Sequence, residues 1–187
     1  MHSFTTERLL IRPLSEEDKA LFINLYTDAK VMRNISAPLS GEKAEKAFHN
    51  TLKIMKKAQP SIMTWVIVNL ADNKAIGIQG FTWPSMKSEQ LNSQKNKTAE
   101  IGIMLLRNSN GRLLPEEAIG ALIEYGLTYI ELEQINACFT KRNLATARVA
   151  KKVGFICNIK EQIEGSGQRI ESVFKNNWQR NYIKKLN

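Results

Sequence analysis

A strand that ends in a polar turn and leads at once into a helix is the feature that most constrains this chain. Residues 100–106 read EIGIMLL, an apolar run of strand length, and residues 108–111 read NSNG, a turn. Pro115 and two glutamates then open a helix with apolar periodicity. In such a turn, free backbone N–H groups and the positive end of a helix dipole point to one place. This arrangement is suited to binding a phosphate group. An ordinary strand-to-helix connection fits this segment equally well.

Three further segments favour the phosphate-binding interpretation. Residues 143–155, NLATARVAKKVGF, follow the strand-like residues 134–139, QINACF, and the chain starts its first strand with residues 6–14, TERLLIRPL. Together the segments resemble the GNAT superfamily of acyl-CoA-dependent N-acetyltransferases, in its ribosomal-protein N-terminal acetyltransferase-like branch. The motifs are a TERLxIRPL strand, an EIGxxLxP-type strand, a GKG-type turn before a TEA-type helix start, and an NxASxRVxxKxGF-type helix. They occur in the family's order and cover nearly the whole chain.

The resemblance implies one GNAT domain over residues 1–187. Its fold class is α/β (α+β), with a central, mixed and mostly antiparallel sheet of about six to seven strands and helices on both faces. The strands that contain Glu100 and Ile135 splay apart at their C-terminal ends, and the acyl-CoA lies in that cleft. The residue pattern itself predicts helices at 15–26, 40–54 and 118–129 and a hairpin of strands at 64–70 and 75–83.

Composition fits a domain of this kind. The chain has 187 residues, of which 43% are hydrophobic, enough for a sizeable core. Cys138 and Cys157 lack metal-ligand spacing, so we expect reduced thiols and no metal. The N-terminus lacks the apolar core of a signal peptide, and no run approaches the ~18 apolar residues of a membrane span. These observations predict a cytoplasmic protein without membrane association.

Positive charge is in excess. The chain has 27 Lys and Arg against 18 Asp and Glu, a net charge of +9. This balance favours contact with polyanions, and the ribosome, nucleic acid and CoA itself all qualify. The basic residues are spread along the sequence without an aromatic-interleaved motif, so a solvated surface explains most of them.

The resemblance also assigns cofactor-binding residues. The backbone of residues 104–106 would hold the pantetheine arm of acetyl-CoA, and the turn that runs into the helix would wrap the pyrophosphate. The residues so assigned are Met104, Leu105 and Leu106 for the arm, and Asn110, Gly111, Arg112, Leu113 and Leu114 for the turn. Asn143 matches an asparagine that bonds the cofactor arm, although it is also a good helix N-cap. Arg148 either approaches the cofactor phosphates or is solvated.

One position departs from the family pattern. The turn usually reads Gly-x-Gly, and here Leu113 replaces the second glycine. A leucine does not easily take a positive φ, and its side chain crowds the place where backbone approaches phosphate. Pro115 removes one N–H, and Glu116 adds a carboxylate near the phosphate site. We therefore expect weakened pyrophosphate binding, which Arg107 and Arg112 could offset.

Acetyl transfer requires removal of an amine proton and stabilisation of a departing thiolate. Glu100 matches a glutamate placed near the acceptor amine, where it acts as base directly or through water; the alternative is a solvated carboxylate at a strand end. Thr146 stands where this branch often has a serine that assists the thiolate; the alternative is a helix N-terminal residue that bonds its own backbone.

Two functions follow from these residues. The first is an acetyl-CoA-dependent N-acetyltransferase that acts on a primary amine, either a protein N-terminus, such as that of a ribosomal protein, or a small molecule, by direct attack in a ternary complex. The second is a catalytically weak GNAT-fold protein that acts through its basic surface on ribosome or RNA. Ribosome association and a monomeric or homodimeric state are compatible with both.

Overall fold

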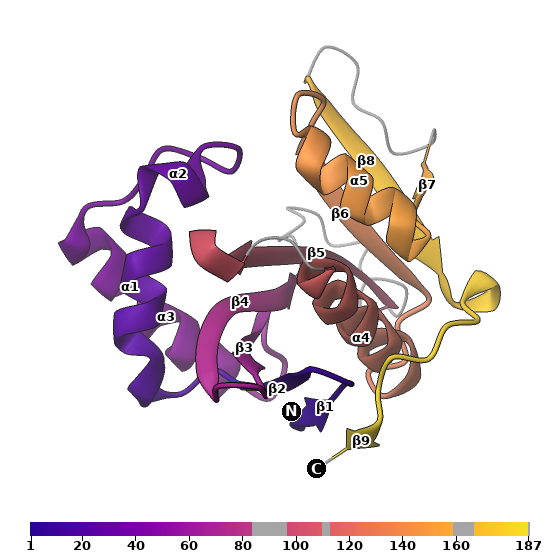
Figure 1. Ribbon diagram of the computed structural model, residues 1–187, viewed down its shortest axis with the longest axis horizontal. Coiled ribbons are helices and arrows are strands. Elements are labelled where there is room, and N and C mark those ends of the chain that lie inside the picture. The colour runs from indigo at the N-terminus through magenta and orange to yellow at the C-terminus, as the bar shows by residue number, and fades with distance from the viewer. Residues whose placement is uncertain (84–96, 110–112, 159–166, 187) are drawn as a thin grey trace.

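The computed structural model describes residues 1–83, 97–109, 113–158 and 167–186 (Figure 1). Its strands form one nine-stranded sheet over these residues, in the order β7-β8-β6-β5-β4-β3-β2-β1-β9. The strands are β1 (Phe4–Thr5), β2 (Leu9–Pro13), β3 (Ile62–Asn69), β4 (Lys74–Thr82), β5 (Thr98–Leu105), β6 (Gln134–Thr140), β7 (Ile156–Cys157), β8 (Gln168–Phe174) and β9 (Lys185–Leu186). The helices are α1 (Lys19–Thr27), α2 (Ala29–Met32), α3 (Gly41–Met55), α4 (Leu114–Thr128) and α5 (Leu144–Val153).

The mixed, mostly antiparallel sheet is confirmed. Neighbouring strands are antiparallel except for β5 and β6, which are parallel. The sheet has more strands than the six to seven expected, because β1, β7 and β9 are only two residues long. A two-residue strand shows no alternation of polar and apolar residues, so a periodic pattern cannot predict it.

Helices cover both faces of the sheet, as expected (Figure 1). On one face, α1 and α3 pack through Phe22, Leu25 and Phe48 against Val66 and Ile78. On the other face, α4 and α5 pack against a larger apolar cluster. That cluster includes Leu9, Ile11, Trp65, Phe81, Ile101, Leu105, Leu122, Ile135, Phe139 and Val153. The sheet is therefore the middle of three layers, and side chains that alternate along one strand belong to different cores.

Short polar residues start the N-terminal helices. Ser40 caps α3 by accepting a hydrogen bond from the N–H of Lys43 at 3.4 Å. Asp28 caps α2, a helix of four residues, with its carboxylate bonded to the N–H groups of Lys30 and Val31. The sequence pattern did not indicate α2, because one helical turn is too short to show apolar periodicity.

Two arginines of the TERLLIRPL segment tie β2 to helices. The Glu117 carboxylate, in the first turn of α4, accepts from Thr6 Oγ1 at 2.5 Å, from Arg8 Nε at 2.6 Å and from the Arg8 N–H at 2.9 Å. Arg12 makes a bidentate pair with Asp18 at 2.8 and 2.7 Å. Burial alone would raise the pKa of Asp18, but hydrogen bonds from Arg12 and Ser15 lower it below its ordinary value. The motif therefore has a structural role, which is to orient α4 and α1 on the sheet.

We expect Glu117→Ala to lower the free energy of unfolding by on the order of 2 kcal/mol, because it leaves Arg8 and Thr6 without their charged acceptor. Glu116→Ala is a matched control. Glu116 lies in the same helical turn but pairs with the exposed Lys152 at 3.3 Å, so its loss should cost less than ~1 kcal/mol. Urea denaturation measures both. Equal losses would show that the Glu117 contacts do not anchor α4.

Candidate active site

The parallel strands β5 and β6 pair over only three positions. Residues Thr98–Glu100 lie opposite Gln134–Asn136, whereas β5 continues to Leu105 and β6 to Thr140. The two strands diverge beyond Glu100, with β5 turning toward α1 and α2 and β6 running beside β8 and α5 (Figure 1). The expected splay is thus present. Beyond Glu100, the side of β5 that faces β6 therefore has no strand paired to it in the described residues, although β5 lies in the middle of the sheet.

The main chain of β5 determines which groups face that opening. The N–H of Leu106 donates to the Ile76 carbonyl at 2.8 Å, toward β4. Main-chain groups alternate in direction along a strand, so those of Ile103 and Leu105 face the opening instead. Among the three residues expected to hold the cofactor arm, Leu105 is therefore the best placed. Ile103 is a further candidate that the motif resemblance did not indicate.

Glu100 lies at the point where the strands separate. It is opposite Thr82 of β4 and Asn136 of β6, and its side chain belongs to the face that carries α1 and α3. The side chain is half-buried, and this burial raises the pKa of its carboxyl group. Across the described residues, its carboxylate has no hydrogen-bond or ion-pair partner. A ligand amine could supply one.

Cys138 lies close enough to Glu100 for the charge of the carboxylate to affect the pKa of the thiol. Burial and the negative charge of Glu100 both raise the pKa of the Cys138 thiol. The thiol donates to Gln168 Oε1 at 3.3 Å. Both cysteines are reduced, as the sequence predicted. Both effects on the pKa disfavour the thiolate, which is the nucleophilic form of the thiol.

Neutral polar groups continue the same face of β6 and β8. Asn136 Oδ1 accepts from Gln134 Nε2 and from Ser172 Oγ, both at 2.7 Å. Ser172 Oγ in turn accepts from Asn158 Nδ2 at 2.9 Å. These bonds hold the wall beside Glu100 in one arrangement without adding charge.

The start of α5 forms the other wall of the splay. Asn143 is 8% exposed, and its Oδ1 accepts from the N–H of Thr146 at 3.2 Å, which confirms the N-cap role. The half-buried Thr146 hydroxyl forms no hydrogen bond with the residues that the structure describes. Arg148 is exposed, and Lys152 follows it by one helical turn and reaches Glu116 of α4.

Leu113 takes the left-handed conformation, with φ 60° and ψ 17°, at the N-cap of α4. Leu113 therefore adopts the positive φ that a leucine does not easily take. Its side chain is 53% exposed and avoids crowding by pointing to solvent. Leu114 is the first residue of α4 and Pro115 the second. Asn110, Gly111 and Arg112 lie outside the described residues.

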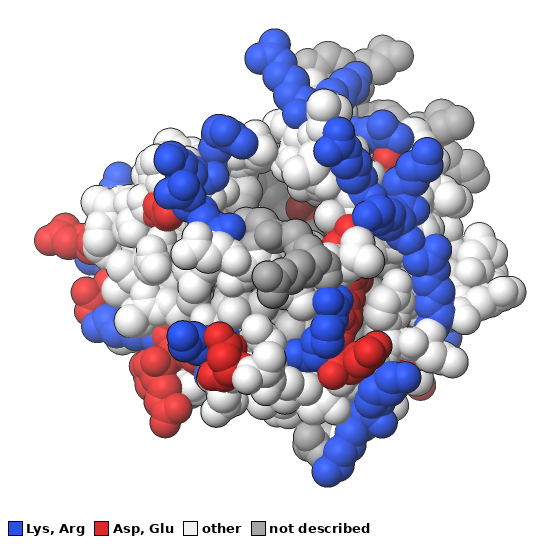
Figure 2. Space-filling model, viewed as in Figure 1, with Lys and Arg blue, Asp and Glu red and all other residues white. Residues whose placement is uncertain are grey.

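The two expected catalytic side chains lie on different faces of the sheet. Glu100 shares its face with α1 and α3, whereas Thr146 belongs to α5 on the other face. Figure 2 shows a hollow between the α1–α2 lobe and α5, with basic side chains on both sides of it.

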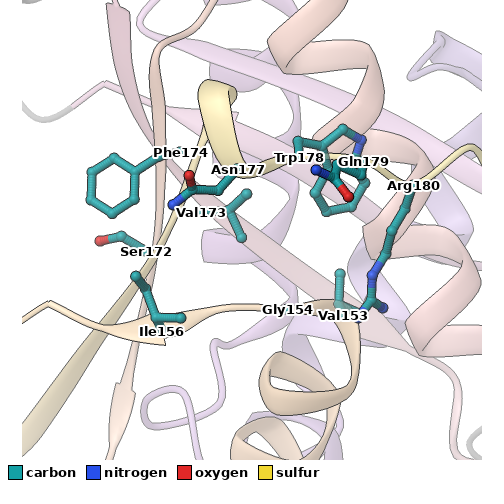
Figure 3. Close-up of a pocket in the computed structure, with 10 residues that line it drawn as sticks. All are labelled: Val153, Gly154, Ile156, Ser172, Val173, Phe174, Asn177, Trp178, Gln179 and Arg180. Atoms are coloured by element: carbon teal, nitrogen blue, oxygen red, sulfur yellow. The ribbon is translucent and has the colours of Figure 1, made fainter.

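A cavity of about 410 Å³ lies away from this splay, at the C-terminal end of α5 (Figure 3). It is lined by Val153, Gly154, Ile156, Ser172, Val173, Phe174, Asn177, Trp178, Gln179 and Arg180. Arg180 donates to the Lys152 carbonyl, so it closes the last turn of α5. The residues expected to bind cofactor or to act as catalysts lie elsewhere, so we do not assign this cavity to the reaction.

The described ranges contain no cluster of metal-ligand side chains and no helix suited to span a membrane. No group of three or more His, Cys, Asp or Glu side chains in these ranges is arranged to hold a metal ion. No helix in them is long and apolar enough to cross a membrane.

Comparison with known proteins supports the assignment made from the motifs. Residues 8–156 match the family model of the acetyltransferase (GNAT) domain. One relative is the uncharacterized N-acetyltransferase p20 of Bacillus licheniformis, which is 27% identical over 157 residues, or 83% of each chain.

Solved structures share the fold at low sequence identity. RimL, a ribosomal-protein α-N-acetyltransferase determined with coenzyme A, has a TM-score of 0.72 at 16% identity over 92% of this chain and 97% of its own. The spermidine N-acetyltransferase of Vibrio cholerae, determined with CoA and spermine, has a TM-score of 0.69 at 18% identity over 90% of this chain and 96% of its own. Because the family model covers most of the chain and the splayed sheet agrees with it, this protein belongs to the GNAT family of acetyltransferases and is an acyltransferase.

Proposed function

We propose that the protein is a cytoplasmic N-acetyltransferase that uses acetyl-CoA to acetylate a primary amine by direct attack in a ternary complex. The observation that carries this proposal is the half-buried Glu100 carboxylate, without a partner among the described residues, at the point where β5 and β6 separate. Two structural neighbours, one named for a ribosomal protein and the other for spermidine, act on amines. These neighbours support an amine acceptor here, whether a protein N-terminus or a small molecule.

The opening between β5 and β6 suits the pantetheine arm of acetyl-CoA. The arm can bond the open edge of β5 at Ile103 and Leu105, as an added strand would. Asn143 uses its carbonyl oxygen to cap α5, so its amide N–H groups stay available to the arm. On α5, Arg148 and Lys152 are exposed cations spaced one helical turn apart, where they can approach phosphates. The turn at Asn110, Gly111 and Arg112, with Leu113 and Leu114, would hold the pyrophosphate.

The two glutamates at the start of α4 are both neutralised by cations. Glu117 is bonded to Arg8, and Glu116 is paired with Lys152. Their repulsion of pyrophosphate is therefore smaller than the sequence alone suggests, because each carboxylate already has a cationic partner. The positive end of the α4 dipole remains available for an anion.

Acetyl-CoA should bind and stabilise the folded protein. A ligand at about 100 times its dissociation constant adds ~2.7 kcal/mol to the free energy of unfolding. Calorimetry and thermal unfolding with acetyl-CoA measure both effects. If folded protein shows neither at millimolar acetyl-CoA, the acetyltransferase proposal fails, and a GNAT-fold binding protein that acts on ribosome or RNA takes its place.

Leu113 gives a second test of the cofactor site. A non-glycine residue in the left-handed region costs roughly 1–2 kcal/mol, so Leu113→Gly should relieve strain, raise the melting temperature and tighten acetyl-CoA. Leu113→Ala is the control, because it removes the side chain but keeps the Cβ that causes the strain. If alanine tightens binding as much as glycine does, side-chain bulk limits affinity instead. If neither changes affinity, the turn does not limit phosphate binding.

Glu100 is the residue that we assign as base. The amine must lose a proton as its nitrogen attacks the thioester carbon and the carbon–sulfur bond breaks. Glu100 can accept this proton, directly or through water, and its raised pKa makes it a stronger base than an exposed carboxylate. Thr146 can donate a hydrogen bond to the departing sulfur, which takes its proton from solvent. An alcohol is a weak acid, so this second contribution should be the smaller.

We expect Glu100→Gln to lower turnover by about 10² to 10⁴, the range typical of general bases, with acetyl-CoA affinity little changed. The wild-type pH–rate profile should have an acidic limb above the ordinary glutamate pKa, because activity needs the deprotonated form. The limb should be absent in Glu100→Gln. Thr146→Ala should cost less and keep the limb. Wild-type turnover of Glu100→Gln at every pH would place the base elsewhere.

A further inference from the structure

We infer that Arg180 is a positioning residue for the cofactor half of the site, although it lies away from the splay. It holds the C-terminal end of α5, and through Lys152 it keeps the Glu116 carboxylate at the start of α4 neutralised. The inference rests on the proposed acetyl-CoA site and concerns the affinity of that site for pyrophosphate.

The C-terminal segment, residues 175–186, crosses the face of the sheet that carries α4 and α5 (Figure 1). It starts after β8, near one edge of the sheet, and ends in β9 at the other edge, where the N–H of Lys184 donates to the Thr5 carbonyl at 2.8 Å. Trp178 and Tyr182 pack against the apolar cluster of that face. The segment is therefore anchored along its length.

Its contact with α4 is close. The Glu124 carboxylate of α4 accepts hydrogen bonds from the N–H groups of Tyr182 and Ile183. The Tyr182 ring lies on Gly120, one helical turn earlier, where an added Cβ would come within 2.4–2.8 Å of three ring atoms. A side chain at position 120 would collide with the ring, so glycine lets the segment lie directly on α4.

Arg180 makes the matching contact with α5. Its guanidinium group donates to the Lys152 carbonyl and lies over Gly154, with Nη2 3.6 Å from where a Cβ of that glycine would lie. Gly154 ends the helix with φ 108°, in the left-handed region that favours glycine. Figure 3 shows the Arg180 side chain extending to this end of α5. A cation that bonds a carbonyl at a helix C-terminus also complements the dipole, so Arg180 stabilises the last turn of α5.

That last turn acts on the start of α4. Lys152 lies in it, and its side chain pairs with Glu116 at 3.3 Å. Glu116 is in the first turn of α4, where the positive end of the dipole faces the proposed pyrophosphate site. The Glu116 side chain is only 17% exposed, so water screens its charge less than that of a surface carboxylate. If the last turn of α5 frays, Lys152 leaves Glu116, and the unpaired carboxylate repels pyrophosphate.

Hydrogen exchange tests the contact with α5 in the absence of cofactor. The N–H groups of Gly154 and Phe155 both donate to the Ala150 carbonyl at 3.0 Å. Arg180→Ala should speed exchange at these two amides in the folded protein, and Arg180→Lys, which keeps a cationic donor, should restore most of the protection. Lys185→Ala removes an exposed cation of the same segment and should leave both amides unchanged. Unchanged exchange in Arg180→Ala would overturn the inference.

Calorimetric titration tests the effect on the cofactor site. Arg180→Ala should weaken acetyl-CoA binding about twofold to fivefold, as expected for a charge at a helix end and a partly exposed ion pair. Lys185→Ala, the control for net charge, should bind as the wild type does. In a Glu116→Gln background, Arg180→Ala should have little further effect, because no carboxylate charge is left to neutralise. Acetyl-pantetheine, which lacks the pyrophosphate, should bind the wild type and Arg180→Ala equally.

The outcomes separate this inference from the proposed function. Additive effects of Arg180→Ala and Glu116→Gln, or a lower melting temperature of Arg180→Ala with unchanged acetyl-CoA affinity, would overturn the inference and leave the proposed acetyltransferase standing. A folded wild-type protein that does not bind acetyl-CoA would overturn both.

Discussion

The short parallel contact between β5 and β6 is the constraint on which the site depends. Three residue pairs join the two halves of the sheet, and the ladder then stops. Parallel pairing through the whole of β5 would leave no open edge for Ile103 and Leu105. Glu100 and Thr146 lie on opposite faces of the sheet, so the proposed ternary complex requires a ligand that reaches both faces. The interrupted ladder therefore bears on both the donor and the acceptor half of the proposed site.

Arginine–carboxylate pairs stabilise the elements around this opening. Arg8 binds Glu117 at the start of α4, and Arg12 binds Asp18 just before α1. Planar guanidinium groups fix the orientation of a carboxylate as well as its distance. The N-terminal segment therefore holds a helix on each face of the sheet, far along the chain from the proposed catalytic residues. The TERLLIRPL motif therefore reflects how the helices are held on the sheet more than how the reaction proceeds.

The motifs predicted the sheet type, the covering helices, the splay and the cap at Asn143. Each depends on local signals, such as turn formers, caps and apolar periodicity. The partners of Glu117, the open edge at Ile103 and the proximity of Glu100 to Cys138 were not predictable, because they join residues distant in sequence. The positive φ of Leu113 and the exposure of its side chain were not predictable either, because leucine disfavours this conformation in isolation. The single domain, the cytoplasmic location, and the monomeric or homodimeric state stay predictions.

The electrostatic influence of Glu100 on Cys138 links the reactivity of the thiol to the charge of the carboxylate. Because the negative charge of Glu100 raises the thiol pKa, any event that neutralises that charge favours the thiolate and speeds its reaction with an alkylating reagent. A bound ammonium group would do so, and so would protonation of Glu100 itself. The exposed Cys157 offers a second thiol in the same molecule for comparison. We therefore expect the rate of alkylation at Cys138, compared with that at Cys157, to change when a ligand binds beside the carboxylate.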